Sequence, residues 1–210
     1  MPFEIVKNDI TSMTADAIVY NGNPQPFIRL TFTPTLPQNN DKELKKEREK
    51  LGPISIGDAL IVPATNLDAK YVIHTEGPTW HGGMFNEINL LRSCYDKIFQ
   101  LALDYNCESL ALPMISSENL GFPKKLAQEI CFTCVTEFLS EHDMMISIVV
   151  PGKASIVLPA KTFNGVSSYI KKNHSHNISD LILEYCELHH IDDLVMINQI
   201  LFKFDQPCIY

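Results

Sequence analysis

The chain has 210 residues, of which 45% are hydrophobic, so it is long enough to bury the core of one globular domain. Its formal net charge of −8 argues against a nucleic-acid-binding protein, because broad contacts with phosphates need many lysine and arginine side chains. No apolar run approaches the roughly 18 residues of a membrane span and no secretion signal is recognisable, so we expect a cytoplasmic protein without membrane contact.

The first third of the chain predicts strands separated by one long irregular segment. Four short β-prone runs are typical of strands: Phe3–Val6, Ala17–Tyr20, Asp58–Val62 and Tyr71–Thr75. Between the second and third runs, Asn23–Asn40 holds four prolines and no helical period, which predicts a loop with at most one irregular strand. Asp41–Lys50 alternates acidic and basic side chains at helical spacing, which predicts an exposed helix.

Helices and strands alternate in the middle of the chain. Glu87–Asp104 is amphipathic with a helical period, and a second helix is expected at Pro123–Glu141. The apolar runs Ala111–Ile115 and Ile146–Val150 read as buried strands on either side of that second helix. This alternation predicts an α/β fold, a three-layer α/β/α sandwich with a largely parallel sheet.

The end of the chain departs from this alternation. After Pro151 and Gly152, a helix is expected near Asn164–Lys172, and a second helical stretch begins at Ile178. We therefore expect one domain over residues 1–173 and a C-terminal helical extension over residues 174–210.

The stretch ALPMISSENLGFP, Ala111–Pro123, is the first candidate for a binding site. A buried strand ends there in small polar residues, and a helix begins at Pro123, whose missing N–H suits a first helical turn. Such a loop directs backbone N–H groups and the positive end of a helix dipole at one point, which favours phosphate. Ligands of parallel α/β sheets bind outside the carboxyl ends of the strands, where this loop belongs.

Five runs occur in an order that resembles the macrodomain family: EIVKNDIT, DAIVYNGN, AKYVIHTEGP, LLRSCYDKIFQLAL and ALPMISSENLGFP. The resemblance covers about residues 2–150. Members of that family bind ADP-ribose, and some hydrolyse ADP-ribosyl bonds. The resemblance therefore implies a mixed sheet, parallel in its centre, between layers of helices, with ADP-ribose or a related adenine nucleotide lying across the strand ends.

The same resemblance implies a set of ligand-binding residues. Asp9, with Ile10, stands where relatives contact adenine, although an aspartate in this turn can equally cap its own backbone. Asn23 matches the asparagine that binds the distal ribose. The residues that correspond to the phosphate-binding loop are Ser116, Ser117, Glu118, Asn119, Leu120, Gly121 and Phe122.

The chain departs from the family pattern in three places. Residues 24–36 are proline-rich where relatives have a glycine-rich phosphate loop and catalytic residues. Glu118 replaces a glycine, and a carboxylate beside a diphosphate opposes binding. Pro151 replaces an adenine-stacking aromatic residue. We therefore expect weak nucleotide binding without efficient catalysis. Two alternatives stay open: an ADP-ribosyl hydrolase with an atypical site within residues 23–40, and a pseudo-macrodomain that binds a protein partner through its C-terminal helices.

The remaining reactive side chains predict no separate chemistry, so neither a metal nor a cofactor is expected. The six cysteines follow no regular spacing, which favours reduced thiols. Cys131 and Cys134 share one helical face and read as packing residues, because no second pair completes a zinc site. His74 reads as a core or turn histidine. Trp80 lies in a loop that could border the pocket, but the sequence indicates no partner for it.

Overall fold

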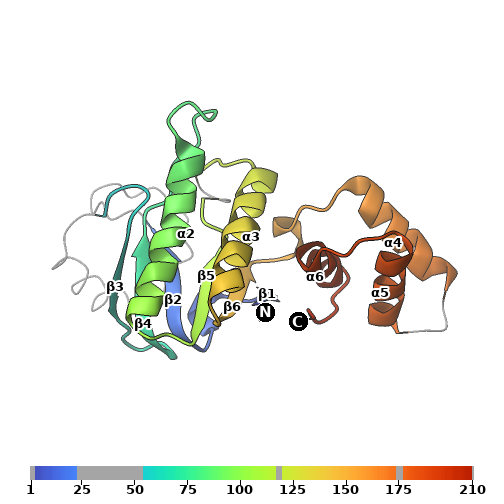
Figure 1. Cartoon of the computed structure of the whole chain (residues 1–210), viewed down its shortest axis with the longest axis horizontal. Coiled ribbons are helices and arrows are strands. Elements are labelled where there is room, and N and C mark those ends of the chain that lie inside the picture. Colours follow the sequence, from blue (N-terminus) through green and yellow to red (C-terminus); the bar gives the residue numbers. More distant parts are fainter. Residues whose placement is uncertain (1–2, 23–53, 117–119, 174–176, 210) are drawn as a thin grey trace.

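The computed structural model describes residues 3–22, 54–116, 120–173 and 177–209. Within these residues, six strands form one sheet in the order β1-β6-β5-β2-β4-β3 (Figure 1). The strands are β1 (Phe3–Lys7), β2 (Ala15–Asn21), β3 (Ala59–Pro63), β4 (Ala69–Thr75), β5 (Ser109–Pro113) and β6 (Met145–Val150). All neighbours pair in parallel except β3, which runs antiparallel to β4. The mixed, centrally parallel sheet that the resemblance implies is therefore confirmed.

The burial of the strands agrees with their positions in the sheet. β2 and β5 are flanked by strands on both edges, and Ala17, Val19 and Leu112 are fully buried, as continuous apolar runs of central parallel strands require. β1 is an edge strand and is separated from β2 by β6 and β5, although β1 and β2 are consecutive in the chain. Their proximity in the sequence therefore does not translate into pairing.

Two long helices cover one face of the sheet, α2 (Glu87–Asp104) and α3 (Lys124–Glu141) (Figure 1). Their apolar stripes meet the sheet through fully buried side chains such as Leu91, Tyr95 and Ile98. Cys131 and Cys134 are buried in this core as free thiols, which confirms their packing role. On the opposite face, the short 3-10 helix η1 (Ile10–Ser12) contributes Ile10 to a small apolar cluster.

The C-terminal part forms a helical unit of α4 (Ala160–Lys172), α5 (Ile178–Leu188) and α6 (Leu194–Lys203), beside the β1 edge (Figure 1). Its helices share a separate apolar core that contains Val166 and Ile182. α4 and α5 approach so closely that a Cβ on Gly165 would lie 2.1 Å from the Tyr185 hydroxyl oxygen. The boundary expected after residue 173 stays a prediction, and α4, which precedes it, packs with α5 and α6.

The helical unit also contacts the sheet directly. Phe202 of α6 belongs to the main core rather than to the helical core. The chain then turns back along the edge strand, where the Ile5 N–H donates to the Cys208 Sγ at 3.4 Å. The C-terminal residues therefore lie on the outer edge of β1.

The predicted elements in the described residues are present, and the helix predicted at Glu87–Asp104 has the observed bounds. One prediction was too coarse: the helical stretch expected from Ile178 onward is two helices, α5 and α6. The loop and charged helix expected within residues 23–50 lie outside the described residues. In the described part of the chain, no helix has the length and apolar character needed to cross a membrane.

Candidate functional site

The carboxyl ends of five parallel strands lie at one edge of the sheet. The residues that follow these strands are therefore brought together, as the fold class predicts. The described ones are Asp9 after β1, Gly22 after β2, Glu76 to Pro78 after β4, Ser116 after β5 and Pro151 after β6.

Three of these strand ends meet at Gly77. The Gly77 N–H donates to the Oδ1 of Asn21, the last residue of β2, at 3.3 Å. A Cβ built on Gly77 would lie 2.3 Å from the Ser116 Oγ and 2.7 Å from a methyl carbon of Ile115. Such distances leave no room for a side chain, so glycine permits the loops after β4 and β5 to come into contact.

Ser116 has an unusual backbone and an unusual side chain. Its φ is +62°, in the left-handed region that costs a non-glycine residue roughly 1 kcal/mol or more. Its side chain is buried, and its Oγ has no hydrogen-bond partner within the described residues. The preceding backbone is fixed, because the Ile115 N–H donates to the hydroxyl oxygen of fully buried Tyr95 at 3.1 Å. A strained, buried and unsatisfied polar group is typical of a ligand site.

The second half of this loop is joined to the loop that follows β4. The Trp80 N–H donates to the Leu120 carbonyl oxygen at 2.8 Å, and the rings of Trp80 and Phe122 lie 4.6 Å apart. Gly121 has a φ of +72°, and a Cβ built there would have no atom of the described residues within 4 Å. Among the described residues, none therefore fills the space beside the Gly121 backbone. The sequence indicated no partner for Trp80, and the structure shows that it contacts Leu120 and Phe122.

The α3 helix begins directly after this loop. The helix begins at Lys124, one position later than predicted, and Pro123 is its N-cap residue. Pro123 makes no side-chain capping hydrogen bond. The first N–H groups of an α-helix have no partner inside the helix. Such N–H groups are suited to an anion, which the helix dipole also attracts.

Glu87 holds the loop between Trp80 and α2 and was missed as a functional residue. Its carboxylate accepts the His81 N–H at 2.8 Å and the Phe85 N–H at 2.7 Å, and the residue is only 1% exposed. Burial alone would raise the pKa of Glu87, but these backbone hydrogen bonds outweigh it and the pKa is lowered. A glutamate in a first helical turn was the available signal.

Asp9 and Ile10 follow β1, which lies at the opposite edge of the sheet from β3 and β4. The Asp9 Oδ1 accepts both the N–H and the hydroxyl of Thr11, at 2.9 and 2.8 Å, so Asp9 does cap its own turn. The side chain is exposed, and these capping bonds use only Oδ1. Capping therefore leaves Oδ2 available, and an adenine contact stays a prediction. Ile10 packs its side chain on the far face of the sheet.

Four of the expected ligand-binding residues lie outside the described residues: Asn23, Ser117, Glu118 and Asn119. Their roles stay predictions. His74 is buried, with its ring 5.5 Å from that of Tyr20, which confirms a core position. Within the residues that the structure describes, no group of three or more His, Cys, Asp or Glu side chains could hold a metal ion.

Known proteins resemble this chain in both sequence and fold. The family model described as "Macro domain" matches residues 28–131. A macro domain-containing protein of Chlorobaculum tepidum is 37% identical over 137 residues, which cover 65% of this chain and 80% of that protein. An O-acetyl-ADP-ribose deacetylase of Citrobacter koseri is 39% identical over 142 residues, which cover 64% of this chain and 78% of that protein.

A solved structure is similar as well. A mutant macrodomain of Oceanobacillus iheyensis, solved with ADPR, has a TM-score of 0.64 and 25% identity, covering 73% of this chain and 87% of that one. The family match begins at residue 28, so it includes part of the proline-rich segment, and the interpretation of that segment as a replaced phosphate loop stays a prediction. Sequence and fold agree, and this chain belongs to the macro domain family.

Proposed function

We propose that this chain binds ADP-ribose or a related adenine nucleotide at the carboxyl edge of the sheet. The observation that carries the proposal is the described part of the loop from Ser116 to Phe122. It combines a buried hydroxyl without a partner among the described residues, a glycine with no described atom near its Cβ position, and the start of α3 directly behind it. Each of these features is suited to phosphate oxygens. The similar macrodomain of Oceanobacillus iheyensis, which was solved with ADPR, supports the same ligand class.

The positions of the strand ends suggest how the nucleotide lies. The adenosine would lie over the ends of β1 and β6, near Asp9 and Pro151, because a carboxylate there can accept the adenine amino group. The diphosphate would face the Ser116–Phe122 loop, and the distal ribose would extend toward β2 and Asn23. This direction follows the strand order, in which β5 lies between β6 and β2.

We expect the affinity to be weak. A proline after β6 cannot stack on adenine as an aromatic ring does, and Glu118 brings negative charge to the diphosphate loop. The whole chain carries a formal charge of −8, which also opposes an anionic ligand. Even a millimolar affinity corresponds to about 4 kcal/mol of binding free energy and is measurable.

Hydrolysis of an ADP-ribosyl ester is a second candidate. The Citrobacter koseri relative named O-acetyl-ADP-ribose deacetylase favours it. Residues 23–40 would have to supply the groups that position the attacking water, with Asn23 at the ribose. We expect this activity to be inefficient, because the proline-rich sequence there does not match the usual catalytic pattern.

Calorimetric titration of the chain with ADP-ribose tests the proposal. We expect saturable heat, with AMP and ribose 5-phosphate binding more weakly as the two halves of the ligand. Absence of both heat and a thermal shift at millimolar ADP-ribose would refute nucleotide binding. Incubation with O-acetyl-ADP-ribose, followed by mass spectrometry in parallel with Asn23→Ala, tests catalysis, since enzymatic release of acetate must be lost in the variant.

A further inference from the structure

The turn that follows β6 borders the proposed adenosine site. β6 ends at Val150, beside Lys7 at the end of β1, and the chain continues through Pro151 and Gly152 into the 3-10 helix η2 (Lys153–Ser155). We call residues 151–156 the β6 turn. Inside it, the Ser155 N–H donates to the Gly152 carbonyl at 3.0 Å and the Ile156 N–H to the Lys153 carbonyl at 3.3 Å.

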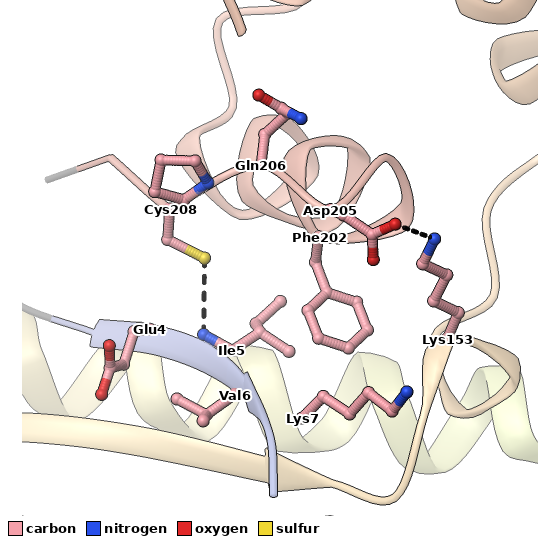
Figure 2. Close-up of a pocket in the computed structure, with 10 residues that line it drawn as sticks. Glu4, Ile5, Val6, Lys7, Lys153, Phe202, Asp205, Gln206 and Cys208 are labelled. Carbon is pink, nitrogen blue, oxygen red and sulfur yellow. Dashed lines mark hydrogen bonds and ion pairs between the residues drawn. The ribbon is translucent and has the colours of Figure 1, made fainter. Parts of the chain in front are cut away.

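The β6 turn is joined to the end of α6 through Lys153. The Lys153 ammonium forms an ion pair with Asp205 at 2.5 Å, and the Lys203 ammonium donates to the Lys153 carbonyl oxygen. Figure 2 shows the ion pair reaching from the η2 segment to the residues that follow α6. Two contacts with the C-terminal helical unit therefore act on one residue of the turn.

At Lys153, packing does not replace these contacts. A cavity of about 410 Å³ lies between β1, Lys153 and the segment after α6, with Ile5, Val6 and Phe202 among its lining residues. In Figure 2, the Lys153 and Asp205 side chains meet at one end of this space and the Cys208 side chain lies at the other. The hollow borders only the Lys153 side of the turn, whereas Ile156 at its other end is 1% exposed and belongs to the main core. The charged contacts therefore hold the turn at Lys153, where packing does not.

Hydrogen bonds hold α6 and the residues after it in place. Buried Gln128 of α3 accepts the Val157 N–H at 2.6 Å, and its amide nitrogen donates to the Gln199 side chain of α6 at 3.3 Å. Fully buried Asn198 exchanges two hydrogen bonds with the backbone of Ile209, at 2.8 and 2.9 Å. α6 and the residues after it are therefore tied to α3 and to each other, so Asp205 has a fixed position.

Asp205 has a wider role than its ion pair with Lys153, because several positive charges gather in its region. Burial lowers the pKa of Lys203, and the positive charges of Lys153 and Lys124 lower it further, so three ammonium groups crowd one region. Asp205 supplies a negative charge among them. Without it, Lys153 and Lys203 would face each other as like charges and would push the β6 turn away from α6.

We propose that Asp205 is a positioning residue that fixes the β6 turn from the C-terminal helical unit and thereby tunes the affinity for the adenosine half of the nucleotide. The proposal rests on nucleotide binding at the carboxyl edge. It assigns the extra helices a role in the site without direct ligand contact.

The variant Asp205→Asn tests this role. Asp205 has a φ of +57°, which asparagine tolerates as well as aspartate does, so the variant removes charge with little change in size or backbone strain. In the ligand-free chain, we expect hydrogen exchange at the Ser155 and Ile156 amides to become about fivefold faster. Unchanged exchange at these amides would overturn the proposal, whether or not the chain binds a nucleotide.

Binding provides the second measurement. We expect Asp205→Asn to weaken ADP-ribose and AMP about three- to fivefold and to leave ribose 5-phosphate unchanged, with a smaller loss at about 1 M salt, where like charges are screened. Equal losses for all three ligands, or none, would overturn the proposal. If the unmodified chain binds no nucleotide, the proposed function and the affinity role of Asp205 both fail, while exchange still shows whether Asp205 fixes the turn.

The matched control is Glu137→Gln at the far end of α3. Glu137 pairs with Arg92 at 2.6 Å, and the two side chains are 59% and 36% exposed, against 74% and 44% for Asp205 and Lys153. This variant removes an ion pair of similar exposure away from the carboxyl edge. It should change neither exchange in the β6 turn nor any of the three affinities, and a change equal to that of Asp205→Asn would overturn the specific role.

Discussion

The α-carbon of Gly77 faces the Ser116 hydroxyl so closely that a Cβ on Gly77 would lie 2.3 Å from that oxygen. The same glycine donates its N–H to Asn21, so one backbone position holds the ends of β2, β4 and β5 together. The diphosphate loop of the proposed site thus depends on a residue that carries no functional group.

Gly77→Ala should damage the site through this contact. The added methyl group meets Ser116 and Ile115, so the loops must separate, and we expect a loss of about 1–3 kcal/mol in the free energy of unfolding together with loss of ADP-ribose binding. Urea denaturation and calorimetry measure the two effects. Gly82→Ala is the control, because its Cβ meets no atom of the described residues within 4 Å and only its φ of +84° is unfavourable. A Gly77→Ala variant that binds normally would contradict the packing argument.

Ser116→Gly should change stability and binding in opposite directions. Glycine adopts the φ of +62° without strain, so we expect the ligand-free fold to gain about 1 kcal/mol. The variant also removes a hydroxyl that we place at the diphosphate, and a typical hydrogen bond is worth about 0.5–1.5 kcal/mol, so the dissociation constant should rise by about two- to twelvefold. Thermal unfolding with and without ADP-ribose measures both changes. A variant that is less stable and binds equally well would assign Ser116 a purely structural role.

Trp80 should report on nucleotide binding by fluorescence. It is the single tryptophan of the chain, its backbone N–H is bonded to the Leu120 carbonyl, and its ring lies 4.6 Å from Phe122. Any adjustment of the diphosphate loop therefore moves the neighbours of the fluorophore. We expect a saturable change in Trp80 emission with ADP-ribose, at the affinity that calorimetry gives.

Trp80→Phe is the matched variant for that experiment. It removes the signal but keeps an aromatic contact with Phe122, so binding measured by calorimetry should persist with a loss of about 0.5–1.5 kcal/mol at most. Calorimetric binding without any change in Trp80 emission would show that the ligand does not approach this loop.

The Glu87 carboxylate should make the loop after Trp80 sensitive to acid. Its folded-state pKa lies below the ordinary glutamate value of 4.5, so its stabilising effect is fully present above about pH 4.5 and is lost as the pH falls through the lower folded value. Glu87→Gln should therefore lower the midpoint of thermal unfolding at neutral pH and should converge with the unmodified chain in acid. Glu141→Gln, at the exposed end of α3, is the control. A difference that persists unchanged at low pH would contradict the charge-based account.

Local patterns in the sequence account for much of the fold. The 3.6-residue apolar period of α2 predicted its bounds, and the buried runs predicted β5 and β6. The break between α5 and α6 was missed, although Asp193 carries a capping signal there, because the apolar residues on both sides read as one stretch. The separation of β1 from β2 was also not predicted, since strand order depends on the whole sheet.

The site was less accessible to sequence reasoning for a physical reason. Asp9 and the Ser116–Phe122 loop belong to short motifs, so their positions at the strand ends could be anticipated. The contacts of Gly77 with Ser116 and of Trp80 with Phe122 join residues about 40 positions apart, and no local pattern encodes them. The ion pair between Lys153 and Asp205 joins two residues that both lie beyond residues 2–150, the part of the chain that the family resemblance covers.

The contact between Ile5 and Cys208 has a consequence for the solution behaviour of the chain. A free sheet edge offers its N–H and carbonyl groups to strands of other molecules, and proteins avoid aggregation by covering such edges. Here Cys208, which follows α6, accepts one N–H on the outer side of β1 and so obstructs a foreign strand at that point. We therefore expect a chain shortened before Asp205 to self-associate through this sheet edge.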